Sequence, residues 1–279
     1  MKRDGRIARK FRELRARAEA GLIPFVVAGD PDLARTKQIV RELEAQGADL
    51  IELGMPFSDP MADGPANQRA MARGLAAGAS LSAILAMVSE IRKESQIPLI
   101  LFGYFNPLLH YGCQRFCADA AQAGVDGLLI VDLPVEESAE LARPATANHL
   151  DLVYLLAPTT PIERSRKIAR AASGFLYYVS VVGVTGARSS LASDLGQRMQ
   201  ELRSVTHLPI AVGFGISTPE QAREVASIAD AVVVGSALSL LIEEHRGAPD
   251  LLETVGAFVS ALKGAIRQAP HAMAASGSS

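Results

Sequence analysis

Eight short apolar runs recur along this chain of 279 residues, and they restrict its fold more than any other feature. Each run is continuously apolar instead of alternating between apolar and polar residues, which is typical of strands buried on both faces in a parallel sheet. Amphipathic stretches separate the runs, so strands and helices are expected to alternate. The runs are LIPFVVAG at 22–29, DLIELG at 49–54, PLILFGY at 98–104, VDGLLIVDLP at 125–134, LDLVYLLAP at 150–158, FLYYVS at 175–180, LPIAVGFG at 208–215 and DAVVVGS at 230–236.

Eight strand and helix units favour a closed barrel over an open sheet, because closure leaves no unpaired edge strand. We therefore predict an α/β fold, a single (β/α)8 TIM barrel, as one domain over residues 1–268. An extra N-terminal helix is expected to pack on the barrel, because Ile7, Phe11, Leu14 and Ala18 share one helical face. The tail at 269–279 is expected to be disordered.

Three pairs of a polar residue and a proline mark expected helix starts. The polar side chain can cap the helix, and proline fits its first position. The pairs are Asn106-Pro107, Thr160-Pro161 with Glu163, and Thr218-Pro219 with Gln221.

The composition excludes several classes of partner. A formal net charge of -2 provides no broad attraction for nucleic acid or anionic lipid. The most apolar stretch, at 231–242, is shorter than the ~20 residues that a membrane-spanning helix needs. Cys113 and Cys117 lie one helical turn apart without a second ligand pair, so reduced thiols explain them better than a zinc site. We expect a cytoplasmic protein that binds a small molecule.

Reactive groups in such a barrel follow the strands, whereas residues that precede strands stabilise the fold. The lysines fall in helical or N-terminal stretches, so a Schiff base lacks its nucleophile. The scattered histidines form no ligand set, so a catalytic metal is not expected. The remaining chemistry is proton transfer by acids on a phosphorylated substrate. Candidates that end or follow strands are Asp30, Glu52, Asp59, Asp63, Tyr104 and Asp132, whereas His149 and His207 precede strands.

Glu52 is the most informative of these candidates. An acid inside the apolar strand LIELG must lose its water, which raises its pKa toward the range useful for acid and base catalysis. The alternative is a structural ion pair with an arginine, although no basic residue stands at a neighbouring strand end. Asp63 is the weaker candidate, because its Asp-Gly-Pro sequence is also an ordinary turn.

Glycine-bearing turns follow the last two strands, at 213–217 and at 235–236, where the second opens directly into a predicted helix. Glycine lets backbone N–H groups approach an anion, and a helix N-terminus adds partial positive charge. These turns are therefore predicted to bind phosphate, the alternative being that each glycine only permits a tight turn. The polar segment 183–190 suits a closing lid, or else is an ordinary loop.

The segment ELGMPFSDPMADGPANQRA at 52–70 closely resembles the signature of tryptophan synthase alpha subunits. The sequence departs from the family at Val27, where threonine is usual, and at Asn67, where an aliphatic residue is common. The likeness covers the chain except its two ends. Further matches are PFVVAGDP at 24–31, FGYFNP at 102–107, DLPVEES at 132–138, SVVGVTGAR at 180–188, GFGIS at 213–217 and VGSA at 234–237.

The resemblance implies a lyase that cleaves indole-3-glycerol phosphate to indole and D-glyceraldehyde 3-phosphate in L-tryptophan biosynthesis. Glu52 and Asp63 match the catalytic acids of the family. Glu52 would carry a proton to C3 of the indole and take one from the hydroxyl, while Asp63 would accept from or stabilise the indole N–H. The implied substrate-binding residues are Phe25, Tyr104 and Tyr177 around the indole or its side chain, Phe214, Gly186, Gly215, Gly235 and Ser236 at the phosphate end, and Thr185 in the lid.

The resemblance also implies an α2β2 complex with a beta subunit that binds pyridoxal phosphate and receives indole through a tunnel. This chain would itself need no cofactor and no metal. The implied contact face includes Pro31, Asp59, Pro60 and Asn106. A free-standing lyase and a non-catalytic subunit that only activates the beta chain are the alternatives. A different phosphate-binding barrel would want lysines or metal ligands at the active end.

Overall fold

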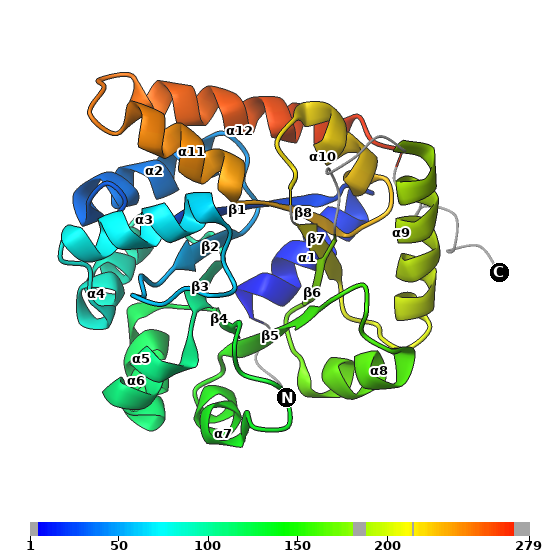
Figure 1. Cartoon of the computed structure of the whole chain (residues 1–279), viewed down its shortest axis with the longest axis horizontal. Helices are drawn as coiled ribbons and strands as arrows, with labels where there is room; N and C mark the ends of the chain where they lie inside the picture. The colour runs from blue at the N-terminus through cyan, green and yellow to red at the C-terminus, as the bar shows by residue number, and fades with distance from the viewer. Residues whose placement is uncertain (1–4, 181–187, 214, 271–279) are drawn as a thin grey trace.

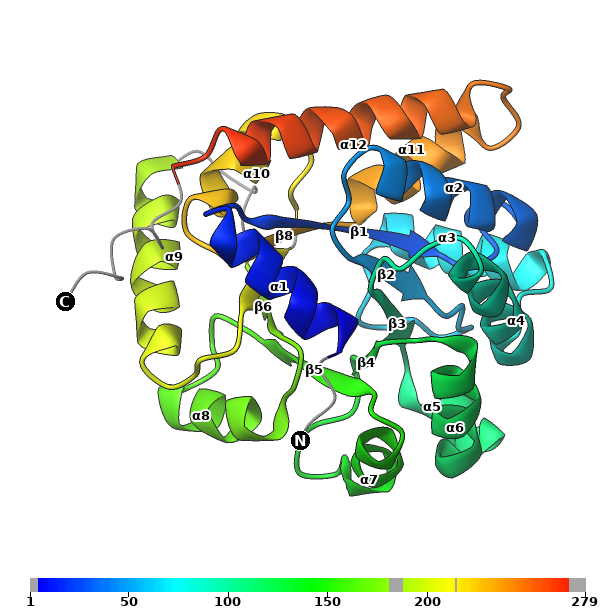
Figure 2. The ribbon, with the colours of Figure 1, turned by 180° about the vertical axis from the view of Figure 1, so that it is seen from behind.

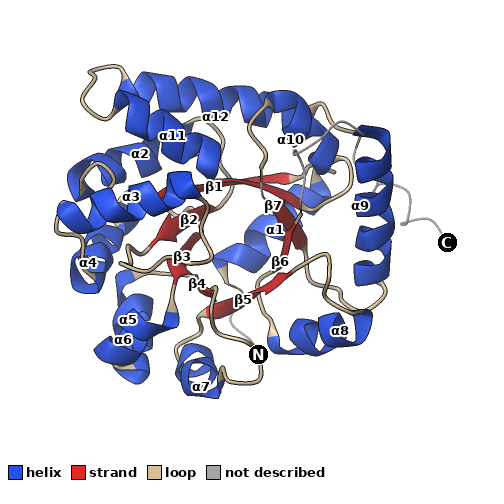
Figure 3. Cartoon of the chain, viewed as in Figure 1, coloured by secondary structure: helices blue, strands red, loops and turns tan. Residues whose placement is uncertain are grey.

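The protein is a closed barrel of parallel strands that run in chain order (Figure 3). The structure is a computed structural model and describes residues 5–180, 188–213 and 215–270. Each strand coincides with one of the apolar runs, β1 beginning one residue before its run, so the predicted TIM barrel is confirmed. The strands are β1 (Gly21–Val27), β2 (Ile51–Gly54), β3 (Leu99–Gly103), β4 (Gly127–Ile130), β5 (Asp151–Leu156), β6 (Leu176–Val179), β7 (Ile210–Gly213) and β8 (Ala231–Val234).

Helices cover the outside of the barrel (Figure 1). The long last helix, α12, packs against α2, α10 and α11 and covers the side of the barrel where β1 meets β8. The helices are α1 (Arg6–Ala16), α2 (Leu33–Ala45), α3 (Pro65–Ala76), α4 (Leu81–Arg92), α5 (Phe105–Tyr111), α6 (Cys113–Ala123), α7 (Ala139–Ala147), α8 (Ile162–Ala171), α9 (Arg188–Arg203), α10 (Pro219–Ala226), α11 (Ser236–His245) and α12 (Leu251–Arg267).

The strands are buried on both faces. One face packs inside the barrel, where Ile23, Ile100 and Leu129 belong to one cluster, and the other packs under the helices, where Leu22 and Leu101 belong to a second. Both layers exclude water, which is why the strands read as continuous apolar runs. A polar side chain on the inner face therefore lies in an apolar environment.

Helix α1 closes the end of the barrel at which the strands begin (Figure 2). Ile7, Phe11 and Leu14 are buried and belong to the same cluster as the inner strand residues. A Cβ atom on Gly21, the first residue of β1, would lie 3.0 Å from Leu14 Cδ1, and one on Gly127, the first of β4, would lie 3.2 Å from Ile7 Cδ1. The predicted packed N-terminal helix is confirmed, and it leaves only the opposite end of the barrel open.

Aspartates that stand just before even-numbered strands hold the preceding strand at this closed end. Each carboxylate accepts a hydrogen bond from a backbone N–H of that strand and also bonds a cationic side chain. Asp49 accepts from the Leu22 N–H at 2.9 Å and from Lys263 at 2.6 Å. Asp126 accepts from the Leu99 N–H at 2.9 Å and from Arg92 at 2.6 Å. Asp230 accepts from the Ile210 N–H at 2.8 Å and from Arg203 at 3.1 Å.

One of the three predicted helix caps forms as expected. The Thr218 side chain accepts from the Gln221 backbone N–H, and the Gln221 side chain returns the bond, which completes a capping box. The prediction that Thr160 caps the next helix was wrong. Helix α8 begins at Ile162 without a side-chain cap, and Thr160 Oγ1 instead accepts from the Ala157 backbone N–H at 3.0 Å.

Two further boundaries differ from the prediction. Helix α5 begins at Phe105 with Tyr104 at its N-cap, so Asn106 lies inside the helix instead of capping it. Ala18, expected on the buried face of the first helix, lies beyond its end with φ of 50°. Both differences amount to one or two residues at a helix end, where local sequence signals are least precise.

Three remaining expectations concern the cysteines, membrane-spanning helices and the C-terminal tail. Cys113 and Cys117 are buried free thiols on α6. Within the described residues, no single helix has both the length and the apolar character for a membrane crossing, although α3 and α4 reach them together as a pair bent by 94°. The tail expected to be disordered falls outside the described residues from 271 onward.

Candidate active site

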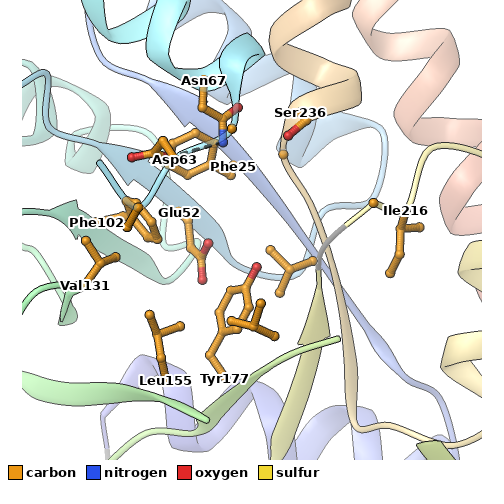
Figure 4. A pocket seen from close by; sticks show the side chains of 16 residues that line it. Phe25, Glu52, Asp63, Asn67, Phe102, Val131, Leu155, Tyr177, Ile216 and Ser236 are labelled. Atoms are coloured by element: carbon orange, nitrogen blue, oxygen red, sulfur yellow. Dashed lines mark hydrogen bonds between the residues drawn. The ribbon is translucent and has the colours of Figure 1, made fainter. Parts of the chain in front are cut away.

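A pocket opens at the end of the barrel where the strands finish, opposite α1 (Figure 4). Acids, aromatic rings and glycine turns form its wall. Parallel strands that end at one rim bring together side chains far apart in the sequence. The predicted residues that line the pocket are Phe25, Glu52, Asp63, Tyr177, Gly215, Gly235 and Ser236.

Glu52 is a buried acid on the inner face of β2, where it pairs in register with Phe25 of β1 and Ile100 of β3. Its side chain points into the pocket (Figure 4), and the residue is only 1% exposed. Oε1 has no hydrogen-bond partner among the described residues. Burial raises the pKa of Glu52 to about 8, because the charged form loses its water without gaining a counter-ion. Glu52 is therefore protonated at neutral pH, and the alternative of an ion pair with arginine is not what the structure contains.

Tyr177 shares the cavity with Glu52. Its ring rises from β6, and its hydroxyl points into the same space as the Glu52 carboxyl (Figure 4). Burial raises the pKa of Tyr177 well above its ordinary value, and the negative charges of Glu52 and Asp63 raise it further. The Tyr177 hydroxyl is therefore a permanent hydrogen-bond donor and acceptor in this pocket.

Asp63 lies in the loop between β2 and α3, and hydrogen bonds hold its carboxyl group. Oδ2 accepts from the Tyr104 hydroxyl at 2.6 Å, and Oδ1 accepts from Asn67 Nδ2 at 3.4 Å. Partial burial raises the pKa of Asp63, while the hydrogen bonds from Tyr104 and Asn67 oppose that rise. Tyr104 does not itself line the pocket but supports Asp63 from outside, and its hydroxyl also accepts from the Ala62 backbone N–H at 3.0 Å.

Apolar groups form the part of the wall next to the acids. The rings of Phe25 and Phe102 meet edge to face with centroids 5.0 Å apart, and Val131 and Leu155 complete this surface. Such a lining suits a flat apolar ring, because apolar surface on the ligand replaces water there. The two acids therefore stand at the edge of a surface that fits an aromatic group.

The opposite side of the pocket is formed by glycine turns and the start of a helix. Gly215, with φ of 75°, follows β7, and Gly235 and Ser236 follow β8 at the N-terminus of α11. The described start of α11 has no side-chain cap, so its first backbone N–H groups remain available to an anion. The described part of the pocket wall contains no lysine or arginine. An anion here would be held by backbone groups and the helix dipole.

Other sequence candidates have structural partners away from this pocket. Asp30 is buried and forms a two-bond ion pair with Arg73 of α3, each bond 2.8 Å long. Asp132 accepts from the Phe105 backbone N–H at 2.8 Å and so caps the start of α5. Asp59 is exposed. These acids position loops and are not brought into the pocket.

The described wall of the pocket contains no lysine. Of the described lysines, Lys263 is buried, but it bonds Asp49 and Glu19 at the closed end of the barrel. Across the part of the chain that the structure describes, no three His, Cys, Asp or Glu side chains gather as metal ligands. Carboxyl and phenol groups are the titratable side chains in the described pocket wall.

Three predicted substrate-binding residues cannot be placed. Thr185, Gly186 and Phe214 lie outside the described residues, as does most of the segment expected to form a lid. Conversely, the pocket contains side chains that sequence reasoning did not assign to it, among them Asn67 and Phe102. Asn67 was noticed only as an unusual residue in the motif, and Phe102 only as part of an apolar strand. A position at the end of a predicted strand was the available signal for Phe102.

The family model described as "Tryptophan synthase alpha chain" matches residues 11–267. Curated relatives carry the same description. The protein from Geobacter sp. strain M21 is 58% identical over 258 residues, which cover 92% of this chain and 96% of the relative. The one from Gluconacetobacter diazotrophicus is 50% identical over 270 residues, covering 95% and 98% of the two chains.

Solved structures agree in fold. Tryptophan synthase subunit alpha from Legionella pneumophila is 40% identical and superposes with a TM-score of 0.87 over 94% of this chain and 98% of the other. Tryptophan synthase from M. tuberculosis in an open form is 31% identical, with a TM-score of 0.84 over 94% and 99% of the two chains.

Proposed function

The chain belongs to the tryptophan synthase alpha chain family, and we propose that Glu52 and Asp63 together catalyse its cleavage of indole-3-glycerol phosphate. As a member of that family it is the lyase subunit that releases indole in tryptophan biosynthesis. The assignment of roles to single residues is our proposal, and the geometry of the pocket supports it.

The reaction requires one proton to be delivered and another to be removed. Protonation of C3 of the indole interrupts its aromaticity and makes the ring an electron acceptor. Removal of the proton from the adjacent side-chain hydroxyl then forms a C=O bond, breaks the bond to C3 and returns the electron pair to the ring. The products are indole and glyceraldehyde 3-phosphate, and the acid that gave the first proton recovers one from the hydroxyl.

The buried, unpaired carboxyl of Glu52 is the observation that carries this proposal. A carboxyl with a pKa of about 8 holds its proton at neutral pH and can still release it to carbon. Because Oε1 has no described partner within the chain, transfer of this proton breaks no internal hydrogen bond. The same group, once ionised, is a base strong enough to take the hydroxyl proton.

Asp63 stands in a more polar setting and fits the second role. The hydrogen bonds from Tyr104 and Asn67 favour its ionised form. A carboxylate at this edge of the pocket accepts from the indole N–H and stabilises the positive charge that appears on the ring after C3 is protonated. Two acids in unlike surroundings thereby divide the work.

The rest of the pocket fits the remainder of the substrate. Phe25 and Phe102 offer apolar surface to the indole ring, and Tyr177 lies beside Glu52 near the bond that breaks. Gly215, Gly235 and Ser236 bind the phosphate through backbone N–H groups. We extend the proposal to Thr185, Gly186 and Phe214 on the resemblance of their motifs.

Indole is small and apolar, so release into water would lose it. As an alpha chain, this protein acts in a complex with a tryptophan synthase beta chain. We propose an α2β2 assembly in the cytoplasm, with pyridoxal phosphate in the beta chain and no cofactor in this one. The expected contact face includes Pro31, Asp59, Pro60 and Asn106, of which Asp59 and Asn106 are exposed.

The direct test is an assay of indole release from indole-3-glycerol phosphate, with and without the cognate beta chain. The purified chain should release indole slowly alone and faster with beta, and the two should co-elute in gel filtration. Release without co-elution or acceleration would indicate the free-standing lyase. Acceleration of the beta reaction without any indole release would indicate the non-catalytic activator and end the roles given to Glu52 and Asp63.

A further inference from the structure

The Asn67 side chain connects Asp63 to helix α11. Its Nδ2 donates to Asp63 Oδ1 at 3.4 Å, and its Oδ1 accepts from Ser239 Oγ at 2.9 Å. Figure 4 shows Asn67 above Asp63 at the upper edge of the pocket. Asn67 belongs to α3 and Ser239 to the first turn of α11, which is also the helix whose N-terminus we assign to the phosphate. The two residues are 172 positions apart, so the tertiary fold creates this contact.

The two ends of the Asn67 amide are not interchangeable in these hydrogen bonds. An ionised carboxylate only accepts hydrogen bonds, so Asn67 must turn its NH2 group toward Asp63. Its oxygen then faces Ser239, whose hydroxyl donates. Ser239 is 1% exposed, so its hydroxyl is shielded from water at the place where it donates to Asn67. In the reversed orientation the Asn67 amide oxygen would face the Asp63 carboxylate oxygen, and the two would repel each other.

The second oxygen of Asp63 is held independently by the Tyr104 hydroxyl. Two donors from different elements, α3 and the start of α5, therefore fix both oxygens of one carboxylate. With either donor missing, the carboxylate can rotate about its last bond. Its lone pairs then no longer point in one direction.

We propose that Asn67 is a positioning residue that keeps the Asp63 carboxylate ionised and aimed at the indole N–H, and that Ser239 fixes the Asn67 amide. The inference rests on the role proposed for Asp63 and deepens it. It also links Asp63 to the phosphate site, because the same turn of α11 carries both Ser236 and Ser239.

A packing role for Asn67 between α3 and α11 makes a different prediction. Packing depends on shape, so the isosteric change Asn67→Asp should be mild and Asn67→Leu more severe. Positioning depends on the donor, so Asn67→Asp should be the worse change. It keeps the shape but sets a second carboxylate against Asp63.

The experiment measures kcat, KM and the pH profile of indole release for Asn67→Leu, Asn67→Asp, Ser239→Ala and the double variant Asn67→Leu with Ser239→Ala. Asn67→Leu should lower kcat about tenfold, as expected for one lost hydrogen bond to a charged group. Ser239→Ala should lower kcat about threefold but add nothing in the Asn67→Leu background, because both act on one contact.

Asn67→Asp should lower kcat more than Asn67→Leu and shift the acid limb of the pH profile upward. The titratable groups that face Asp63 are Tyr104 from the start of α5 and, across the pocket, Glu52 and Tyr177. Binding of glycerol 3-phosphate should stay within about twofold of the unchanged protein, because the phosphate turns are intact. Ser165→Ala, a buried serine on α8, is the matched control and should leave kcat and the pH profile unchanged.

Wild-type kcat and an unchanged pH profile in folded Asn67→Asp would overturn the inference, as would a loss confined to KM. Thermal unfolding shows whether each variant is folded. If the Asn67 variants do not fold, the kcat of Ser239→Ala is the test, and an unchanged kcat would overturn the inference. Additive effects of Asn67→Leu and Ser239→Ala would also count against it. Failure of the unchanged protein to release indole would instead remove the proposed function and this inference together.

Discussion

The hydroxyl of Tyr177 lies where a side chain on Gly213 would begin. A Cβ atom built on Gly213 overlaps this hydroxyl and comes within 2.8 Å of Val233 Cβ. Gly213 is the last residue of β7 and pairs with Val179 of β6. Because Gly213 has no side chain, the Tyr177 hydroxyl can occupy this space beside Glu52.

Gly213→Ala should therefore push the Tyr177 ring into the pocket. We expect kcat/KM for indole release to fall at least tenfold and the free energy of unfolding to fall by about 1–3 kcal/mol, the usual cost of overpacking a core. Indole release and urea unfolding would measure the two effects. Gly264→Ala on α12 is the control, because its Cβ meets nothing within 4 Å. It should stabilise the helix by roughly 0.5–1 kcal/mol without changing activity. Equal behaviour of the two variants would refute the steric argument.

Glu52→Gln should abolish indole release, because an amide of the same shape cannot transfer a proton to carbon. Binding of glycerol 3-phosphate should remain, since the phosphate turns lie on the other side of the pocket. Isothermal titration and an indole assay would give the two results. Turnover in the glutamine variant would take the central role away from Glu52.

The stability of the protein should depend on pH through Glu52. In the unfolded chain Glu52 loses its proton near pH 4.5, whereas in the fold its pKa is raised to about 8. The folded state thus holds one more proton between these values, so the free energy of unfolding contributed by this group falls as pH rises from 4.5 to 8. Relative to Glu52→Gln, the unchanged protein should lose a few kcal/mol between pH 5 and pH 9. Urea unfolding of both proteins at pH 5, 7 and 9 measures this difference, and parallel curves would contradict it.

Asp63→Asn should reduce kcat by at least a hundredfold, because the amide cannot stabilise a positive charge on the indole ring. It keeps the shape of the side chain, so the protein should remain folded. Steady-state kinetics with circular dichroism would show this. Asp119→Asn, on α6 and bonded to Tyr111, is a control away from the pocket and should be unchanged. A rate near normal would reduce Asp63 to a turn residue.

Ser236→Asp should affect the fold and ligand binding in opposite directions. A carboxylate at the N-terminus of α11 favours the helix by about 0.3–1 kcal/mol. It also occupies the place of the phosphate with like charge, so the Kd for glycerol 3-phosphate should rise at least tenfold. Thermal unfolding without ligand and titration with it separate the two effects. Unaltered affinity would place the phosphate elsewhere.

The sequence was sufficient to predict the barrel and the chemistry of its principal acid. Continuous apolar runs require strands covered on both faces, and the structure has them. Glu52 stands inside such a run, so its burial followed from its position along the chain. The direction of its pKa shift needed no coordinates.

Contacts between distant segments could not be predicted. Tyr104 reaches Asp63 over 41 positions and Asn67 reaches Ser239 over 172, and both contacts depend on how the barrel closes. Local signals also failed where tertiary contacts compete. Thr160 had the sequence of a helix cap, but its hydroxyl accepts from Ala157 and α8 starts without it.

The aspartates at the closed end, Asp49, Asp126 and Asp230, each have a strand N–H and a cation as partners, whereas Oε1 of Glu52 at the open end has no hydrogen-bond partner among the described residues. The carboxyl groups that tie strands together and the carboxyl group proposed to transfer protons thus lie at opposite ends of one molecule. A laboratory library confined to the closed end should therefore change thermal stability with little effect on the reaction rate, whereas a library at the open end should change both.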